Sequence, residues 1–428
     1  MPSQTSATHD STATSSPARG RFRQLPVLAG RTFLPLGLIA RLPLAMLTVG
    51  ALTLITAATD SYAAGGFAAG AVGIGSALGA PVLGYLADHY GQRLVLIASA
   101  ALNAAAIGAL LLAGSLAGPG TGLFPTLVTA FLMGATCPQI GPLARVRWMA
   151  LTRRRPADLD TALSYESTAD EATFVLGPAL VGLLASLLAP WLPLALAALL
   201  TVIFVSAFAM HPTERAVVPL RRRAPDQPTR SRRVSGLRAW GPVALPVLGM
   251  LMMGTFFGST QTALAAFAGG FGAATSAGLL YAVMGISSAL AALSVAYWPQ
   301  RISHPLRWLT SAGGMSAAAI LLLHATDIPY MLIALLVLGV PVGPTMVSIF
   351  SLGSMVAPGH LVGTVMTLLA SGIVAGTSIG ASLAGSMADG NGPSAFVVPV
   401  AAAVVLFILG TISMALLRSS QGYGYRHG

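Results

Sequence analysis

Long apolar stretches separated by short polar segments run along almost the whole chain. Each is long enough to cross a bilayer, because about 20 mostly apolar helical residues span the hydrocarbon core. Lipid offers the backbone no hydrogen-bond partner, so apolar runs of this length are expected to form helices. The pattern predicts twelve spans, at 33–56, 62–87, 94–114, 122–143, 160–188, 191–210, 243–268, 274–297, 307–325, 328–351, 362–387 and 394–417.

Composition supports a membrane protein. Hydrophobic residues make up 55% of the 428 and charged residues 8%, whereas about a quarter of a soluble domain is charged. So few charges could not cover a surface that faces water. The chain is therefore predicted to be an all-α membrane protein whose solvent is the bilayer.

A basic segment, 211–240, divides the apolar part into two blocks, 33–210 and 241–417, with six predicted spans each. Matched halves predict two six-helix pseudo-repeat bundles, an arrangement that transporters use to alternate access to a site near the midplane. We expect 211–240 to be a cytoplasmic linker. Residues 1–32 are predicted to be a disordered cytoplasmic tail and 418–428 a second cytoplasmic tail.

The arginines predict the orientation. The sequence has no lysine, and 22 of its 23 arginines fall in the two tails and in the connections that follow even-numbered spans. Basic residues stay on the cytoplasmic side, so both termini are expected there, in a multi-pass protein of the cytoplasmic (inner or plasma) membrane. This topology explains the net charge of +11. Lipid rather than nucleic acid is therefore the predicted partner of the basic loops.

The connection between the second and third spans reads GYLADHYGQR, from Gly84 to Arg93. Gly84 would permit close helix contact, Gly91 would relax a tight turn, and Asp88 could face a helix N-terminus or Arg93. The alternative is a loop that only turns the chain.

This connection resembles the signature loop of the major facilitator superfamily (MFS), roughly G-x-L-A-D-R-x-G-R-R. The resemblance implies the superfamily's twelve-helix fold over 33–417 and a conformational switch between the halves at this loop. Two basic positions of the pattern are replaced, and the matching positions are Gly84, Leu86, Asp88, Gly91 and Arg93.

Span five contains Gly177-Pro178, followed by Gly182, which resembles part of a motif of facilitator-family antiporters. Pro178 frees a backbone carbonyl and bends a helix. We expect Gly177, Pro178 and Gly182 to form a hinge, the alternative being an ordinary kinked helix. The family often carries an arginine inside span four, but here Arg145 and Arg147 are expected only at its cytoplasmic end.

Ionisable residues inside spans are costly and usually functional. At about 1.5 Å per helical residue, Arg41 in span one lies level with Glu166 and Asp170 in span five. We expect Arg41 to pair with one of these carboxylates in one access state and to release it for protonation in the other. Glu171 points elsewhere on the helix. The alternative for all four residues is a structural ion pair.

Polar side chains in other spans are candidates for lining a substrate cavity, although each could equally be an interhelical hydrogen-bonder. The lone cysteine, Cys137, can form neither an intrachain disulfide nor a metal cluster and is interpreted as a small buried hydrophobe. No phosphate-binding loop of the GxxxxGK[ST] type occurs, and no cofactor or metal is predicted. The cavity candidates are Gln139, Gln261, Tyr281 and Thr345.

The sequence therefore predicts a secondary active transporter, acting as a monomer, that exports a small amphipathic compound in exchange for protons by alternating access. The partial antiporter motif and the apolar, Gly-rich interior favour export. The alternative is a proton symporter that imports a sugar, an amino acid or an organic acid. A membrane-embedded enzyme or receptor is disfavoured, because no span carries a His/Cys cluster that could serve catalysis.

A reporter fused within the basic segment tests the orientation. A fluorescent protein that matures only in the cytoplasm should fluoresce when fused at Pro225, because eight arginines in 211–240 hold this segment on the cytoplasmic side. Alkaline phosphatase, which is active only outside the cytoplasm, should be inactive at the same position. High phosphatase activity there would overturn the predicted topology.

Overall fold

The computed structural model describes residues 21–117, 122–153, 155–222, 237–271, 277–299, 301–388 and 392–424. Within these residues, twelve helical segments are long and apolar enough to cross a membrane. The spans of the first half are α2 (Phe33–Thr59), α3 (Tyr62–Tyr90), α4 (Gln92–Leu116), α5 (Phe124–Ala135) with α6 (Ile140–Leu151), α7 (Pro156–Leu187), and α8 (Leu192–Leu200) with η2 (Thr201–Val205) and α9 (Ser206–Met210). Those of the second half are α10 (Leu237–Gly270), α11 (Ala277–Ser294) with η6 (Val295–Tyr297), α12 (His304–Ala319) with η7 (Ile320–His324), α13 (Ile328–Val356), α14 (Val362–Ala388), and η8 (Gly392–Phe396) with α15 (Val397–Gly424).

The twelve predicted spans are confirmed, and one of them differs in form. Span four is broken between α5 and α6 over residues 136–139, where Pro138 removes a backbone donor. After the break it continues to Leu151, eight residues beyond the predicted end at 143. The extension draws Arg145 and Arg147 into the interior, where both are fully buried. The expectation that both lie only at the end of this span is therefore wrong for Arg145, which reaches Asp170, whereas Arg147 lies near the helix end and donates to Gln92 and Thr213.

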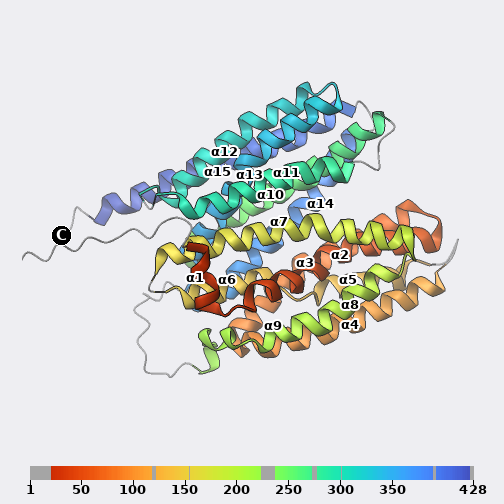
Figure 1. The fold of residues 1–428 in the computed structure, drawn as a ribbon, viewed down its shortest axis with the longest axis horizontal. Coiled ribbons are helices and arrows are strands. Elements are labelled where there is room, and N and C mark those ends of the chain that lie inside the picture. The colour runs from red at the N-terminus through yellow and green to blue at the C-terminus, as the bar shows by residue number, and fades with distance from the viewer. Residues whose placement is uncertain are drawn as a thin grey trace, which may run out of the picture.

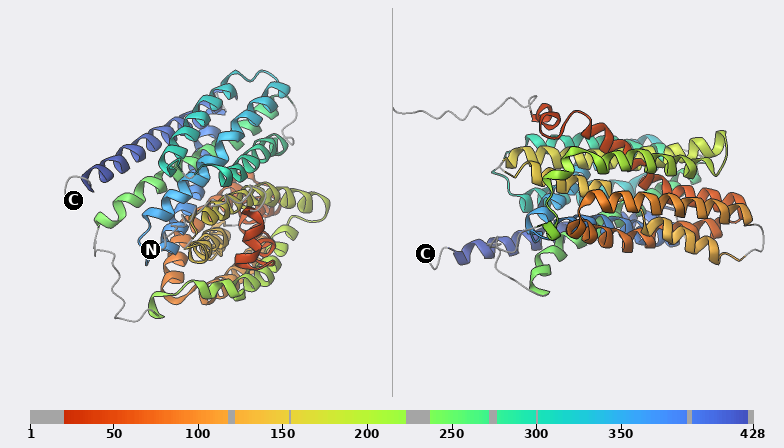
Figure 2. Two further views of the ribbon diagram at one scale, coloured as in Figure 1. Left: turned by 60° about the vertical axis from the view of Figure 1, so that its left-hand side comes forward. Right: turned by 90° about the horizontal axis from the view of Figure 1, so that it is seen from below.

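The helices form two six-helix bundles side by side, one from α2 to α9 and the other from α10 to α15 (Figure 1). The bundles meet where α3 packs against α14 and α7 against α11. The helix α1 (Arg21–Ala29) and the C-terminal end of α15 lie at the same end of the molecule (Figure 2). We call this the terminal end.

Glycines bring helices into backbone contact at equivalent places in the two halves. In the first half, a Cβ on Gly75 or Gly79 of α3 would overlap the backbone of α5. In the second half, a Cβ on Gly343 of α13 would overlap the backbone of α11. Helices in lipid associate through such close packing, because lipid tails are as apolar as their side chains.

The segments predicted as tails and linker are more ordered than expected. Residues 21–29 form α1, whose Leu25 and Ala29 are buried against the first half. The linker begins with two short 3₁₀ turns, η3 (Pro212–Ala216) and η4 (Leu220–Arg222), and α10 begins inside it. The helix α15 continues through 418–424. Residues 1–20, 223–236 and 425–428 lie outside the described residues, so the predictions made for them stay untested.

Two glycines of α10 provide a matched test of this packing. A Cβ on Gly258 would lie 2.7 Å from the carbonyl carbon of Thr377 in α14, whereas a Cβ on Gly269 has nothing within 4 Å. Gly258→Ala should destabilise the purified protein, because overpacking of this kind costs about 1–3 kcal/mol. Gly269→Ala should leave the thermal unfolding temperature unchanged or slightly higher. Equal behaviour of the two variants would contradict the packing described here.

Candidate functional site

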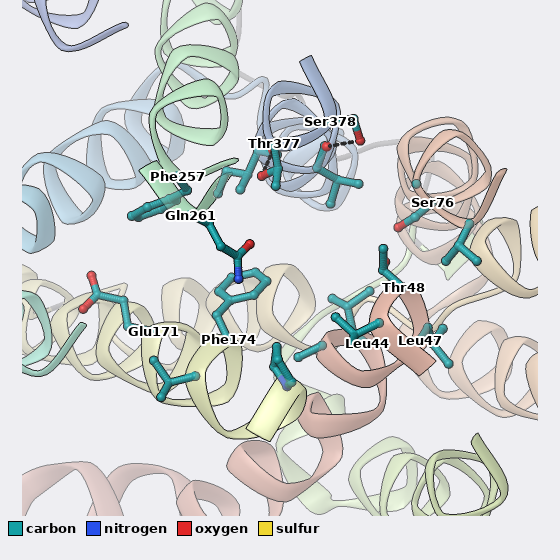
Figure 3. Close-up of a pocket in the computed structure, with 18 of the residues that line it drawn as sticks. Leu44, Leu47, Thr48, Ser76, Glu171, Phe174, Phe257, Gln261, Thr377 and Ser378 are labelled. Atoms are coloured by element: carbon teal, nitrogen blue, oxygen red, sulfur yellow. Dashed lines mark hydrogen bonds between the residues drawn. The ribbon is translucent and has the colours of Figure 1, made fainter. Parts of the chain in front are cut away.

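A cavity of about 200 Å³ lies between the two halves (Figure 3). Its walls come from α2, α3, α5, α7, α10, α11 and α14 and from the break between α5 and α6, and most of the lining side chains are apolar or aromatic. Such a lining suits a small amphipathic molecule, since ligand cavities are mostly apolar with a few placed polar groups. The polar side chains on its walls are Thr48, Ser76, Glu171, Gln261, Tyr281, Ser288, Thr377 and Ser378.

Among the described residues, Glu171 is the only carboxylate on this cavity's wall, and no arginine lines it. Its side chain leaves α7 toward the second half, where Oε1 accepts a hydrogen bond of 2.7 Å from the Ser288 hydroxyl. Oε2 is buried and has no hydrogen-bond partner among the described residues. An ionised Glu171 would therefore be a buried charge without a cation, which is costly.

A smaller chamber of about 40 Å³ adjoins the larger cavity. The two share wall residues, among them Leu44, Phe174 and Val374. In contrast to the larger cavity, the smaller chamber is lined by two arginines, Arg41 and Arg145.

These arginines belong to a buried cluster of four charges at the interface of α2, α6 and α7. Arg41 donates to Glu166 and lies 3.3 Å, Nε to Oδ1, from Asp170. Arg145 Nη2 lies 2.7 Å from Asp170 Oδ2. Two guanidinium groups thus face two carboxylates, and the cluster is neutral when all four are ionised.

Two aromatic side chains complete the charge cluster. The indole Nε1 of Trp148 donates a 2.6 Å hydrogen bond to Glu166 Oε1. The guanidinium carbon of Arg145 lies 3.8 Å from the ring centroid of Phe350, which comes from α13 in the second half. This cation–π contact attaches the first-half cluster to the other bundle.

The structure brings together three of the four predicted charged residues. Arg41, Glu166 and Asp170 are in contact, as the depth argument indicated, while Glu171 lies apart against the second half. Their role in proton coupling stays a prediction.

The predicted cavity residues fall in three places. Gln261 and Tyr281 line the larger cavity and Gln139 the smaller chamber. Thr345 lines neither of them in this conformation, and its hydroxyl donates to the carbonyl of Pro341 one turn earlier in α13. Its place in a substrate cavity stays a prediction. Cys137 is buried, as expected, and lies on the wall of the larger cavity.

The expected hinge in span five stays a prediction. The helix α7 runs without interruption through Pro178. Gly177 packs closely on α2, since a Cβ there would lie 2.6 Å from that of Ala45. A Cβ on Gly182 would have nothing within 4 Å, so this glycine is not needed for helix contact in this conformation.

Sequence reasoning missed Arg145, Trp148 and Ser288. A signal for the first two was present, because the apolar run that begins at Ile140 continues through both to Leu151. Reading this run as helix places Arg145 one turn after Gly141 and inside the protein. Nothing in the sequence marked Ser288, which becomes notable only because Glu171 faces it.

Comparison with known proteins identifies the family. The family model described as "Major Facilitator Superfamily" matches residues 34–381. The chain belongs to this superfamily. No curated protein matches it in sequence.

Solved structures of MFS transporters share the fold. They include a bacterial homologue of the iron transporter ferroportin in its outward-facing state, at TM-score 0.69 and 16% identity, covering 90% of this chain and 99% of that one. The human organic anion transporter MFSD10 (TETRAN) aligns at TM-score 0.66 and 17% identity, covering 89% and 99%. FucP in its outward conformation aligns at TM-score 0.61 and 15% identity, covering 89% and 98%. Identities this low show the fold alone.

In this MFS chain, the signature loop caps a helix of the other half. The carboxylate of Asp88 accepts hydrogen bonds from the backbone N–H groups of Gly363 and Thr364, at 2.9 and 2.7 Å, at the N-terminus of α14. The Thr364 hydroxyl donates a third bond of 2.8 Å. Of the two expected partners of Asp88, the helix N-terminus is therefore the one observed, while Arg93 is exposed.

The glycines of the signature loop allow this contact. A Cβ on Gly84 would lie 2.8 Å from the carbonyl oxygen of Gly363, so only glycine lets α3 approach α14 this closely. Gly91 has a φ of +98°, which residues with a Cβ rarely adopt. Both expectations from the sequence are confirmed.

Further contacts between the halves lie at the terminal end of the MFS fold. Arg307 Nη1 in α12 lies 3.2 Å from Asp160 Oδ2 near the start of α7. Arg307 is the first residue of the predicted ninth span, but the span begins earlier, at His304, and the arginine side chain is buried. The helix α1 also reaches the second half, where Arg21 donates a 2.5 Å bond to the carbonyl of Ala296. The terminal end is closed between the halves.

Asp88→Asn tests the contact with α14. The amide of asparagine can accept at one oxygen only, so it should lose the contacts made by Asp88 Oδ2 and weaken the closed terminal end. Transport by an MFS protein depends on the balance of its access states, so the initial rate should fall several-fold at unchanged membrane abundance. His89→Gln, which changes the half-buried neighbour outside the contact with α14, is the control. Normal rates in the Asp88 variant would show that the loop is only a connector.

Proposed function

We propose that this MFS transporter exports a small amphipathic compound across the cytoplasmic membrane in exchange for protons, with both termini in the cytoplasm. The protein would work as a monomer through alternating access. The larger cavity, between the two halves and lined mainly by apolar side chains, would bind the compound. The observation that carries this proposal is Glu171, the one carboxylate that the described part of the chain places on the wall of that cavity.

Glu171 is suited to exchange a proton for a substrate. Its buried Oε2 has no partner among the described residues, and no arginine lines the cavity with it. A bound proton would remove the cost of the buried charge, and so would a cationic group of a substrate. Because both neutralise the same oxygen, they exclude each other, which is the condition for antiport.

The four-charge cluster would link this exchange to the change of access. Asp170 faces two arginines, whereas Glu166 is held by Arg41 and Trp148. We propose that a movement of α2 relative to α7 separates Arg41 from Asp170 or Glu166, which then binds a proton. The cation–π contact of Arg145 with Phe350 would couple this movement to the second half.

The arginines of the smaller chamber favour one alternative, a proton symporter that imports an organic acid or an amino acid. Arg41 Nη1 and Arg145 Nη1 are buried and lack hydrogen-bond partners among the described residues. Such donors suit a carboxylate. In this alternative the proton and the substrate bind together rather than in turn.

Transport in proteoliposomes tests the proposal, once a susceptibility panel that compares cells with and without the gene has supplied a substrate. An imposed pH gradient should drive uphill movement of this substrate, and Glu171→Gln should abolish it, because glutamine cannot exchange a proton. Exchange of labelled for unlabelled substrate should persist. Asp60→Asn is the matched control, since Asp60 is exposed and its left-handed backbone, φ 52°, suits asparagine.

The cluster carboxylates belong to the same experiment. Asp170→Asn should lose gradient-driven transport while retaining exchange, and Glu166→Gln should behave similarly. If the Glu171→Gln protein transports the substrate uphill at the parental rate, Glu171 is not the site at which proton and substrate exchange. Uphill transport by both cluster variants, singly and together, would reduce the cluster to a structural role. Proton flux in the same direction as the substrate would favour the symporter.

A further inference from the structure

We propose that the two adjoining cavities form one bipolar binding site, whose ligand is an amphipathic zwitterion with a carboxylate in the smaller chamber and an ammonium group beside Glu171. This inference rests on the proposed transport function, because it assigns a substrate class to the same site. It is carried by unpaired donors at one end of the site and an unpaired acceptor at the other.

The unpaired buried groups of the smaller chamber are donors, whereas its carboxylate, Asp170, is already bound to Arg41 and Arg145. Arg41 Nη1 and Arg145 Nε and Nη1 are buried without hydrogen-bond partners among the described residues, and the two side chains are 4% and 0% exposed. Both arginines line the chamber. A buried donor without an acceptor is costly, and guanidinium groups bind carboxylates through charge-assisted hydrogen bonds.

The space beside these donors is open because residue 141 is glycine. A Cβ on Gly141 would lie 2.9 Å from Asp170 Oδ1, and 3.4 Å from both Arg145 Nη1 and Arg41 Nε. Any larger residue would therefore occupy the point where the donors converge. The chamber, about 40 Å³, has room for a carboxylate or for a few water molecules.

The larger cavity presents the opposite charge. Glu171 Oε2 is a buried acceptor without a partner among the described residues, while Ser288 fixes Oε1. An ammonium group supplies three donors and no acceptor, and it would take the place of the proton on Glu171. The substrate's own ammonium group would thus preserve the exchange on which antiport depends.

One small molecule can reach both ends. Asp170 and Glu171 are consecutive in α7, so their Cα atoms are about 3.8 Å apart, and their side chains point about 100° apart. Asp170 faces the arginines and Glu171 the larger cavity. Phe174, one turn further along α7, lines both cavities and offers an apolar surface for the body of the ligand.

Three probes that share one aromatic body test this site. They are 4-(aminomethyl)phenylacetate, which carries both charges, 4-methylphenylacetate, which carries only the carboxylate, and 4-methylbenzylamine, which carries only the ammonium group. Binding to the full-length protein in nanodiscs is measured by calorimetry and by the shift in thermal unfolding temperature. The zwitterion should bind about tenfold or more tightly than either singly charged probe, because each charged end adds charge-assisted hydrogen bonds.

Two substitutions should separate the ends. Gly141→Ala fills the smaller chamber without removing a charge. It should therefore lower the affinity for the zwitterion and for the acid about tenfold and leave the affinity for the amine unchanged. Glu171→Gln should lower the affinity for the zwitterion and for the amine and leave the affinity for the acid unchanged. Gly108→Ala, at a glycine of α4 with nothing within 4 Å of its Cβ, and Asp60→Asn are the matched controls.

Several results would overturn the inference. If the amine binds as tightly as the zwitterion, the smaller chamber holds water and no carboxylate. If the acid binds as tightly as the zwitterion, Glu171 does not bind the ammonium group. Absence of binding by all three probes would also refute it. The probe comparison needs only the unaltered protein, so it stands even when a variant fails to fold. Binding is measured without a proton gradient. A protein that binds the zwitterion but does not couple transport to protons would therefore support this inference while contradicting the proposed antiport.

Discussion

The neutrality of buried charge is the constraint on which this structure depends. In a chain with 8% charged residues, four ionisable side chains are gathered at the interface of α2, α6 and α7, and each faces an opposite charge. Removing one partner would strand another in the interior, which costs about 3–5 kcal/mol. The three helices are thereby held in one register. Glu171 lies outside this balance, and its unpaired oxygen is the group on which the proposed function of the larger cavity rests.

Close backbone packing makes this arrangement possible. Lipid cannot drive helices together by hydrophobic burial, so contact must come from shape. Glycines supply it within each half, as at Gly79 and Gly343, and between the halves, as at Gly84. Close packing at glycines also shapes the site, because Gly141 lets α6, and Gly177 lets α2, approach the charged residues of α7. A Gly-rich sequence therefore builds both the scaffold and the space inside it.

The fold could be predicted from sequence because it follows from one-dimensional signals. Apolar length fixed the twelve spans, and the level of Arg41 relative to Glu166 followed from helical rise alone. The site could be predicted only in part, because contacts between distant helices leave no local pattern. Ser288 opposite Glu171 is one example, because the two residues are 117 positions apart in the chain. Arg145 was lost for a different reason, since its charge was taken to mark the end of a helix that in fact continues.

The helix α7 connects all parts of the proposed mechanism. Near its start Asp160 contacts Arg307 of the second half, in its middle Asp170 belongs to the charge cluster, and the next residue, Glu171, faces the larger cavity. These groups lie on one unbroken helix, so a rigid movement of α7 must change all of them together. In the proposed mechanism, opening the terminal end would separate Asp160 from Arg307 and, in the same movement, alter the pairing of Asp170 and the surroundings of Glu171. The proposed coupling between proton and substrate would then need no signal passed from residue to residue, because a single helix carries the contact at the terminal end, a carboxylate of the charge cluster and the carboxylate of the cavity.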